Sequence, residues 1–353
     1  MRGLVLEGGG AKGAYEAGAI KALNKRKIKF DCVGGTSIGA INAACYVSSN
    51  IESMYKLWLK LDSDDLFGID TKLLSDFDNN NISKENILKT IQTIKSIIKN
   101  KGIETTSIKQ VLKKSISERK FRKSKIDFVM VTCNVSKFKP VVAFKEDIPK
   151  GKLIEYLLSS AYLPIFKLER IIDGSFYMDG GLYSNCPVDI LIDKGYKEIY
   201  AIKAWQSKLK YTPKRGVKVH IITPSENLGS IMLFEHNKAQ YRMNLGYYDT
   251  LKYLDKLDGN KYYLKNYSEK YYSSLFDRKI YKEIINKYNN GEKPKSNKQF
   301  IIKIIELVCK ELNIERFRVY NVPFLISKLK YKLAGRFDNK YYYFIKNIKV
   351  DFE

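Results

Sequence analysis

Residues 33–43 read VGGTSIGAINA, and this stretch decides the fold because it sets one serine between two glycines. Ser37 lies between Gly35 and Gly39 in the pattern G-x-S-x-G. Residues 28–33 predict a β-strand before the motif, and the apolar residues after it recur at helical spacing. A strand, a sharp turn and a helix in this order are typical of a nucleophile elbow, which exposes a serine hydroxyl.

A second unit of the same kind precedes the elbow. Residues 3–7 (GLVLE) form a short apolar run, residues 8–13 (GGGAKG) supply a glycine turn, and residues 14–25 carry apolar side chains at helical spacing. Two consecutive strand–helix units predict parallel strands in a layered α/β domain. Further strands are predicted, making six or seven in one sheet, at 126–133, 139–144, 170–178, 197–203 and 216–223.

The first glycine turn has two interpretations. Residues 8–13 match G-x-G-x-x-G, a pattern that also occurs where dinucleotides bind. That reading expects a ribose-binding acid at the end of the second strand, but this strand leads into the Ser37 elbow instead. The other interpretation is an oxyanion site made by the amides of Gly9 and Gly10, with positive charge from Lys12 nearby.

A serine nucleophile needs a group that takes its proton, and the chain has only two histidines, His220 and His236. Residues 173–181 read DGSFYMDGG, which predicts a hairpin turn and then a carboxylate, Asp179, followed by two glycines. A carboxylate is a weak base, yet it can accept the proton while oxyanion donors stabilise the developing charge. We expect Asp179 to be that base.

These three motifs, in this order, resemble the patatin-like phospholipase family. The segments SSAYLPIF (159–166) and DGGLYSNCPV (179–188) are also similar to family segments, although Cys186 stands where asparagine is common and Lys12 where arginine is common. The resemblance covers about residues 3–225. It implies an oxyanion loop that consists of Gly8, Gly9, Gly10, Lys12 and Gly13. It also implies an elbow at Gly35, Ser37 and Gly39, and an aspartate motif at Asp179, Gly180 and Gly181.

The resemblance implies a three-layer fold with a central, mostly parallel sheet flanked by helices. It also implies a bacterial lipid acyl hydrolase of phospholipase A type, which cleaves ester-linked fatty acids with a Ser37–Asp179 dyad through an acyl-enzyme. No metal or other cofactor is expected. Head-group preference, acyl position, oligomeric state and any role as an effector, toxin or defence protein, with an activating ligand or host factor, are left open.

Two other kinds of protein stay open alongside the dyad enzyme. The order Ser37, Asp179, His220 is that of an α/β-hydrolase triad, although His220 lies inside a predicted strand. The chain could also be a non-catalytic lipid-binding or regulatory protein that keeps the fold. A nucleic-acid binder is not expected, since only the aromatic and basic C-terminal part suggests it.

Composition favours a cytoplasmic protein that meets membranes at their surface. The chain of 353 residues has 63 Lys and Arg against 38 Asp and Glu, a net charge of +25, which favours a polyanionic partner, either a membrane surface or a nucleic acid. For the lipid hydrolase that the resemblance implies, this charge suits anionic phospholipid. Five scattered cysteines argue against a disulfide framework. We expect no signal peptide, and no apolar run approaches the roughly 18 residues of a transmembrane helix.

Changes in composition along the chain predict its domain organisation. Residues 1–255 are expected to form the hydrolase domain, in which 50–125 make a helical insertion or lid region. Within it, residues 84–100 (KENILKTIQTIKSIIKN) predict an amphipathic helix. Residues 256–353, rich in Tyr and Lys, are expected to form a mainly helical C-terminal extension of unknown role, including a helix over 298–312.

Overall fold

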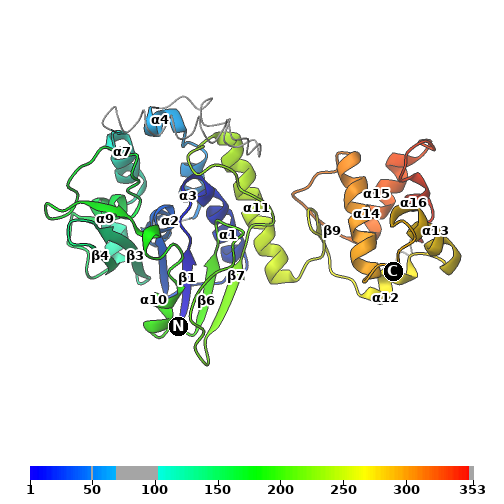
Figure 1. The fold of residues 1–353 in the computed structure, drawn as a ribbon, viewed down its shortest axis with the longest axis horizontal. Coiled ribbons are helices and arrows are strands. Elements are labelled where there is room, and N and C mark those ends of the chain that lie inside the picture. Colours follow the sequence, from blue (N-terminus) through cyan, green and yellow to red (C-terminus); the bar gives the residue numbers. More distant parts are fainter. Residues whose placement is uncertain (49–50, 69–101, 350–353) are drawn as a thin grey trace. The chain divides into compact units, whose positions relative to one another are not determined.

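The computed structural model describes residues 1–48, 51–68 and 102–349, and it divides the chain into two units (Figure 1). The first unit is Met1–Thr250 and the second is Leu251–Glu353. The division falls within α11 (His236–Asp255).

A seven-stranded sheet organises the described part of the first unit. Its strand order is β4-β3-β2-β1-β6-β7, with β5 paired to β3 off this path. Neighbouring strands are parallel except that β4 and β5 each run antiparallel to β3. The predicted, mostly parallel sheet is therefore confirmed. Its strands are β1 (Arg2–Leu6), β2 (Cys32–Thr36), β3 (Asp127–Asn134), β4 (Lys139–Phe144), β5 (Tyr177–Asp179), β6 (Glu198–Ile202) and β7 (Lys218–Ile222).

The strand predicted over 170–178 differs from the observed one. Only Tyr177–Asp179 joins the sheet, as β5, and an isolated bridge links Ile172 to Ser175. Between them Asp173 and Gly174 have φ angles of 47° and 68°, so this part of the segment is a tight turn. The Asp-Gly turn is confirmed, and it lies within the segment that was predicted to be one longer strand.

Helices cover both faces of the sheet. α10 packs against Val5 of β1 and Val129 of β3 on one face. Successive strand residues point to opposite faces, and on the other face α2 lies against Leu6. The helices of this unit are α1 (Gly13–Lys25), α2 (Ile38–Ser48), α3 (Ile51–Trp58), α4 (Ser63–Phe67), α7 (Thr106–Ser115), α8 (Glu118–Lys123), α9 (Leu153–Ser160), α10 (Val188–Asp193) and α11, with 3-10 turns η1 (Gly10–Lys12) and η2 (Gly180–Leu182).

The region expected as a helical insertion is described only in part. Its described residues form α3, α4, α7 and α8. Residues 69–101, which include the predicted amphipathic helix over 84–100, lie outside the described residues. Across the ranges that are described, no helix combines the length and apolar character required to cross a bilayer.

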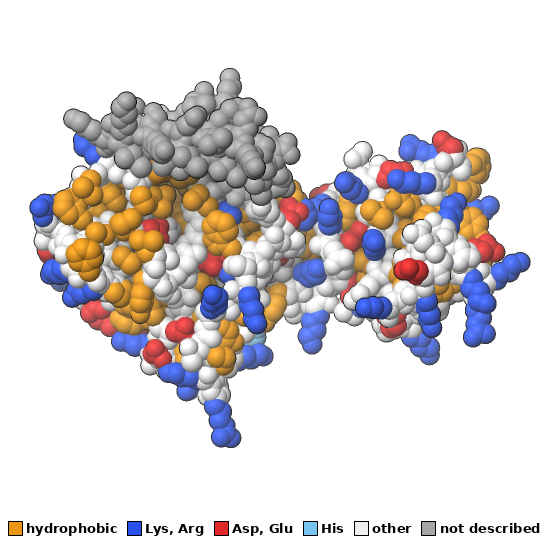
Figure 2. Space-filling view, viewed as in Figure 1, with side chains coloured by type: hydrophobic (Ala, Val, Ile, Leu, Met, Phe, Trp, Pro, Cys, Tyr) orange, Lys and Arg blue, Asp and Glu red, His pale blue; other side chains and the backbone are white. Residues whose placement is uncertain are grey.

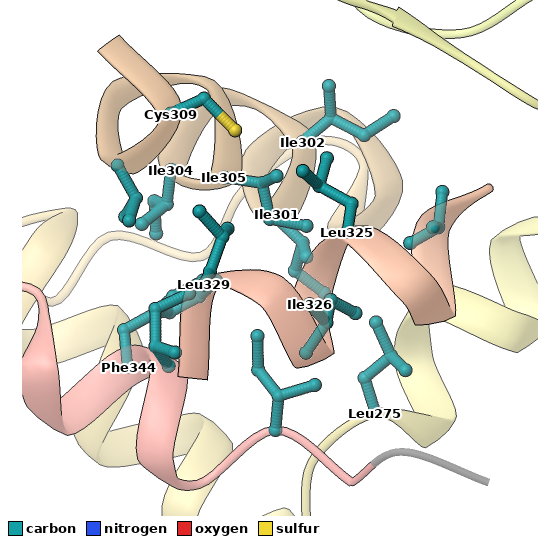
Figure 3. Packing of buried hydrophobic residues seen from close by; sticks show 14 of the residues in the cluster. Leu275, Ile301, Ile302, Ile304, Ile305, Cys309, Leu325, Ile326, Leu329 and Phe344 are labelled. Carbon is teal, nitrogen blue, oxygen red and sulfur yellow. The ribbon is translucent and has the colours of Figure 1, made fainter. Parts of the chain in front are cut away.

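The second unit is mainly helical, as predicted, and has its own apolar core (Figure 3). Ile305 of α14, Leu329 of α15 and Phe344 of α16 are fully buried together in this core. A short parallel pair of strands completes the unit. Its elements are β8 (Tyr263–Leu264), α12 (Glu269–Ser274), α13 (Arg278–Tyr288), α14 (Asn297–Glu311), β9 (Val319–Tyr320), α15 (Val322–Leu333) and α16 (Tyr342–Lys346).

Two glycines bring α1 and α11 into backbone contact in the first unit. A Cβ atom at Gly18 would lie 1.9 Å from the carbonyl oxygen of Met243, and one at Gly246 would lie 1.9 Å from that of Tyr15. Neither position can carry a side chain unless the helices separate. This contact supports α1, which begins at the end of the first glycine turn.

Substituting Gly18→Ala tests this contact. The added methyl must push α11 away, and overpacking of this kind costs roughly 1–3 kcal/mol of unfolding free energy. Chemical denaturation should measure that loss, whereas Asn24→Ala, at an exposed position of the same helix, should change stability by no more than about 0.5 kcal/mol. Equal stability of the two variants would contradict the backbone contact.

Candidate functional site

Ser37 occupies the sharp turn between β2 and α2. Its φ of 57° is in the left-handed region, which is strained for a residue with a side chain. The turn is possible because Gly35 and Gly39 lack side chains. A Cβ at Gly35 would lie 2.5 Å from the carbonyl carbon of Gly39, and one at Gly39 would lie 2.4 Å from the Leu6 oxygen. The segment has the geometry of a nucleophile elbow.

Ser160, at the end of α9, holds the backbone of the elbow. The amide of Ser37 donates a hydrogen bond to Ser160 Oγ at 2.9 Å. The Ser160 hydroxyl in turn donates to the carbonyl of Val131 in β3 at 2.6 Å. All three groups lie in a buried region, where an unsatisfied amide would be costly. Ser160 thus links the strained turn to the neighbouring strand.

β5 brings Asp179 beside the elbow by continuing the line of β2. β2 pairs with β3 up to Thr36, which lies opposite Val131. β5 pairs with β3 from the next residue onward, where Thr132 lies opposite Asp179. Because β4 occupies the other edge of β3, both β2 and β5 use the same edge. Asp179 therefore arrives from the opposite direction at the point where β2 ends.

The Asp179 carboxyl group accepts a hydrogen bond from the amide of Gly181 at 2.7 Å. Burial raises the pKa of this carboxyl above its usual value, although the nearby Ser37 side chain and the Gly181 amide both act to lower it. Gly180 must lack a side chain, since a Cβ there would lie 2.1 Å from the Val131 oxygen. The serine and the aspartate predicted from the sequence are thus brought close together.

The first glycine turn lies against the same site, where a Cβ at Gly8 would come 3.1 Å from the Ser37 Cβ. Four successive carbonyl groups of this turn accept hydrogen bonds from the protein. Their donors are Asn185 Nδ2 and Trp205 Nε1 for Gly8, the Lys12 amide for Gly9, the Gly13 amide for Gly10, and Arg242 Nη1 for Ala11. The negative ends of these peptide dipoles are therefore all directed into the protein.

Within the same turn, two amides donate hydrogen bonds to described residues and two do not. Those of Gly8 and Ala11 donate to the carbonyls of Asn185 and Ile231, at 3.0 and 2.7 Å. The amides of Gly9 and Gly10 have no hydrogen-bond partner among the residues that the structure describes. Gly10 has a φ of 54°, and a Cβ there would lie 2.2 Å from the Ile231 oxygen. Two adjacent donors are thus left in the turn, and Gly10 lines the same pocket as Ser37.

Buried charges fix the position of this turn. Arg242 of α11 is 3% exposed and donates to the carbonyls of Ala11, Leu228, Ser230 and Leu233. Glu7, which directly precedes the turn, forms a buried ion pair with Lys203 at 2.7 Å and accepts the Trp205 amide. The Lys12 ammonium lies 3.2 Å from the centre of the Trp205 ring, so its charge interacts with the indole.

An apolar pocket opens at Ser37. Its lining consists mostly of apolar side chains from α2, α3, α4, α7 and residues 231–234. Among them are Ile41, Trp58, Phe67, Ile108 and Phe234. Ser37 and Gly10 lie in its wall. A pocket of this composition suits a hydrocarbon chain whose reactive end lies at the serine.

Polar side chains buried behind the pocket hold its wall in place. The Trp58 indole donates to Asn42 Oδ1 at 3.0 Å, and Asn42 Nδ2 donates to Glu16 at 2.8 Å. Burial raises the pKa of Glu16 well above its usual range, despite the hydrogen bond from Asn42, which lowers it. Burial at this position thus favours the uncharged form of Glu16.

The two histidines lie elsewhere. His220 is in β7, stacked on Tyr200, and its Nε2 is 3.2 Å from Glu198, the first residue of β6. Ser37 instead follows the carboxyl end of β2. His236 is exposed at the start of α11, with Nδ1 3.0 Å from the Leu59 oxygen. Neither histidine contacts Asp179 in the way a triad requires.

Two residues that hold the candidate site in place were not predicted from the sequence, although both lie in segments that the sequence singles out. Ser160 supports the elbow, and Asn185 binds Gly8 through both its backbone and its side chain. Their partners lie 123 and 177 positions away along the chain. Nothing in the sequence around either residue indicates these contacts.

The fold thus places a serine at an elbow, a carboxylate and a glycine turn together where β2 ends. The family model "Patatin-like phospholipase" matches residues 4–192, which is more than half of the chain. The chain therefore belongs to the patatin-like phospholipase family.

Curated relatives match only parts of this chain. A "Probable lipid hydrolase 463L" of Invertebrate iridescent virus 6 is 28% identical over 194 residues, 54% of this chain and 62% of the viral protein. "Lysophospholipase nte1" of Aspergillus terreus is 28% identical over 205 residues, covering 57% of this chain but 12% of the fungal protein. The chain thus spans less than two thirds of these relatives. Among solved structures, VipD from Legionella pneumophila is similar with a TM-score of 0.43 at 16% identity, covering 96% of this chain and 85% of VipD.

Replacing Ser160 by alanine tests the support of the elbow. Ser160→Ala leaves the buried Ser37 amide without its acceptor, which should lower the free energy of unfolding by about 1–3 kcal/mol. Ser159→Ala is the matched control, because the Ser159 hydroxyl bonds only the Tyr156 carbonyl of its own helix. Chemical denaturation should separate the two variants, and a loss as large in the Ser159 variant would contradict the assigned role.

Proposed function

We propose that this chain is a lipid acyl hydrolase in which Ser37 and Asp179 form a catalytic dyad. The observation that carries the proposal is the closeness of Ser37 to the partly buried Asp179 carboxyl at the end of β2, against the glycine turn that contains Gly9 and Gly10. Membership of the patatin-like phospholipase family supports an ester of a lipid as substrate. The apolar pocket at Ser37 supports a fatty acyl chain.

The reaction proceeds in two steps. Ser37 Oγ attacks the ester carbonyl while its proton passes to Asp179, and the oxyanion is held by the amides of Gly9 and Gly10. The carbon–oxygen bond to the alcohol breaks, and Asp179 returns the proton to the departing alkoxide. Water then attacks the acyl-enzyme carbonyl while Asp179 takes its proton. The bond from the acyl carbon to Ser37 Oγ breaks, Asp179 returns the proton to Ser37 Oγ, and the fatty acid leaves. An oxyanion donor contributes roughly 3–4 kcal/mol to lowering the barrier.

Exposed apolar side chains around the site support action at a membrane surface. Leu182 and Tyr183, directly after the D-G-G motif, are 70% and 59% exposed. Phe138 is 92% exposed in the turn beyond the carboxyl end of β3, the edge of the sheet at which Ser37 lies. Figure 2 shows further apolar side chains gathered on one face of this unit. Such a rim inserts into lipid, while the basic surface attracts anionic head groups.

The dyad is tested by release of fatty acid from phospholipid vesicles. Ser37→Ala and Asp179→Asn should each lower kcat/KM by about three to four orders of magnitude, since each removes a reacting group. His220→Ala should retain activity because its ring contacts Glu198 and Tyr200. Activity lost in His220→Ala but kept in Asp179→Asn would transfer the base role to histidine.

The pH dependence gives a check within the same assay. Asp179 must be ionised to accept a proton, so activity falls as the pH drops through its pKa. Because burial raises that pKa, the acidic limb should lie above the ordinary pKa of an aspartate. The limb should be the same in wild type and His220→Ala, and thermal denaturation should show that each variant is folded.

Acyl-chain selectivity tests the pocket. Ile108→Trp fills it from α7 and should shift preference toward short-chain esters, by about tenfold for every two methylene groups excluded. Gln110→Trp, at an exposed position of the same helix, is the matched control and should leave the preference unchanged. Hydrolysis of a series of esters of increasing chain length measures the chain-length preference of both variants. Identical profiles would show that the acyl chain binds elsewhere.

A further inference from the structure

A second, basic cleft lies in the first unit between α3 and the α7–α8 segment. Its volume is about 770 Å³. Five lysines line it, two from α3 and the residues after it and three from α7 and α8: Lys56, Lys60, Lys113, Lys114 and Lys120. Serine side chains, including Ser115 and Ser117, also lie in its wall. Both kinds of side chain can donate hydrogen bonds to an anion.

The lysines of this cleft are not balanced by nearby acids. No Asp or Glu is among its described lining residues, and none of the five lysines forms an ion pair within the described ranges. The acidic side chains next to the cleft form ion pairs with basic residues outside it. Glu52 lies 3.7 Å from Lys21, and Glu118 binds Arg122 at 2.9 Å. Like charges gathered in a concave surface repel one another and raise the local concentration of anions.

The cleft is separate from the hydrolytic site. No residue of the elbow, the glycine turn or the D-G-G motif lines it. It shares Leu57, Leu61 and Val111 with the apolar pocket, so these side chains stand between the lysines and the space open to Ser37. An ester held at Ser37 with its acyl chain in the pocket would place its own head group away from the lysines.

We propose that this cleft binds a multiply charged phosphate group, supplied either by an anionic lipid head group or by a soluble phosphate ester. Several lysine ammonium groups, acting as point charges with three donors each, suit the dianion of a phosphomonoester or a pyrophosphate. The proposal concerns binding at a second site and does not depend on the dyad. The shared wall places the ligand next to the residues that shape the acyl pocket.

Calorimetry of the full chain with pyrophosphate and with inositol hexakisphosphate tests the soluble source. The triple variant Lys56→Gln/Lys60→Gln/Lys114→Gln should bind about 100-fold more weakly, from roughly fivefold per lysine. The matched control is Lys197→Gln/Lys208→Gln/Lys210→Gln, which removes the same charge from exposed lysines outside the cleft and should bind as the parent does. All substituted lysines are exposed, so both variants should keep the melting temperature of the parent.

Vesicle flotation tests the lipid source. The Ser37→Ala background prevents hydrolysis, and phosphatidylcholine vesicles carry either phosphatidic acid or phosphatidylserine at matched surface charge. Preference for phosphatidic acid that is lost in the cleft variant alone assigns a lipid phosphate, whereas an effect confined to calorimetry assigns a soluble one. Equal binding by the cleft and control variants in both assays overturns the proposal. Hydrolysis by the wild type is measured separately, so failure of one proposal leaves the other standing.

Discussion

The candidate site depends on a close approach of three backbone segments at the elbow. Leu6 of β1, Gly35 of β2 and Gly39 of α2 lie so near one another that neither glycine could carry a side chain. This contact forces the chain through the left-handed conformation at Ser37. The strained residue then requires a partner for its amide, which Ser160 provides from α9. Position, strain and hydrogen bonding of the serine thus follow from one steric constraint.

Strand register supplies the second half of the site. β5 is only three residues long, yet it takes over the edge of β3 at the residue after β2 ends. An aspartate reached from distant sequence is thereby delivered to the serine without a long loop. Burial in this position disfavours the charged carboxylate. The fold therefore tolerates an unfavourable ionisation at the residue that the proposed chemistry needs as a base.

Local sequence patterns predicted much of this arrangement, since turns and amphipathic runs depend on neighbouring residues. The elbow, the Asp-Gly turn, most strands and the helical character of the C-terminal part were all accessible in this way. The shortness of β5 was not, because pairing with β3 limits it. Nor were the contacts of Ser160 and Asn185, which join segments more than a hundred residues apart. Resemblance to a family singled out their segments but not their partners.

The glycine turn also bears on how the product of the proposed reaction binds. Its carbonyl groups all point into hydrogen bonds, and a buried guanidinium from Arg242 lies behind it. The uncompensated ends of its peptide dipoles are therefore positive. Donors prepared in this way attract a carboxylate as well as an oxyanion. In the reaction proposed above, a released fatty acid would therefore rebind at the turn and compete with the ester as free fatty acid accumulates.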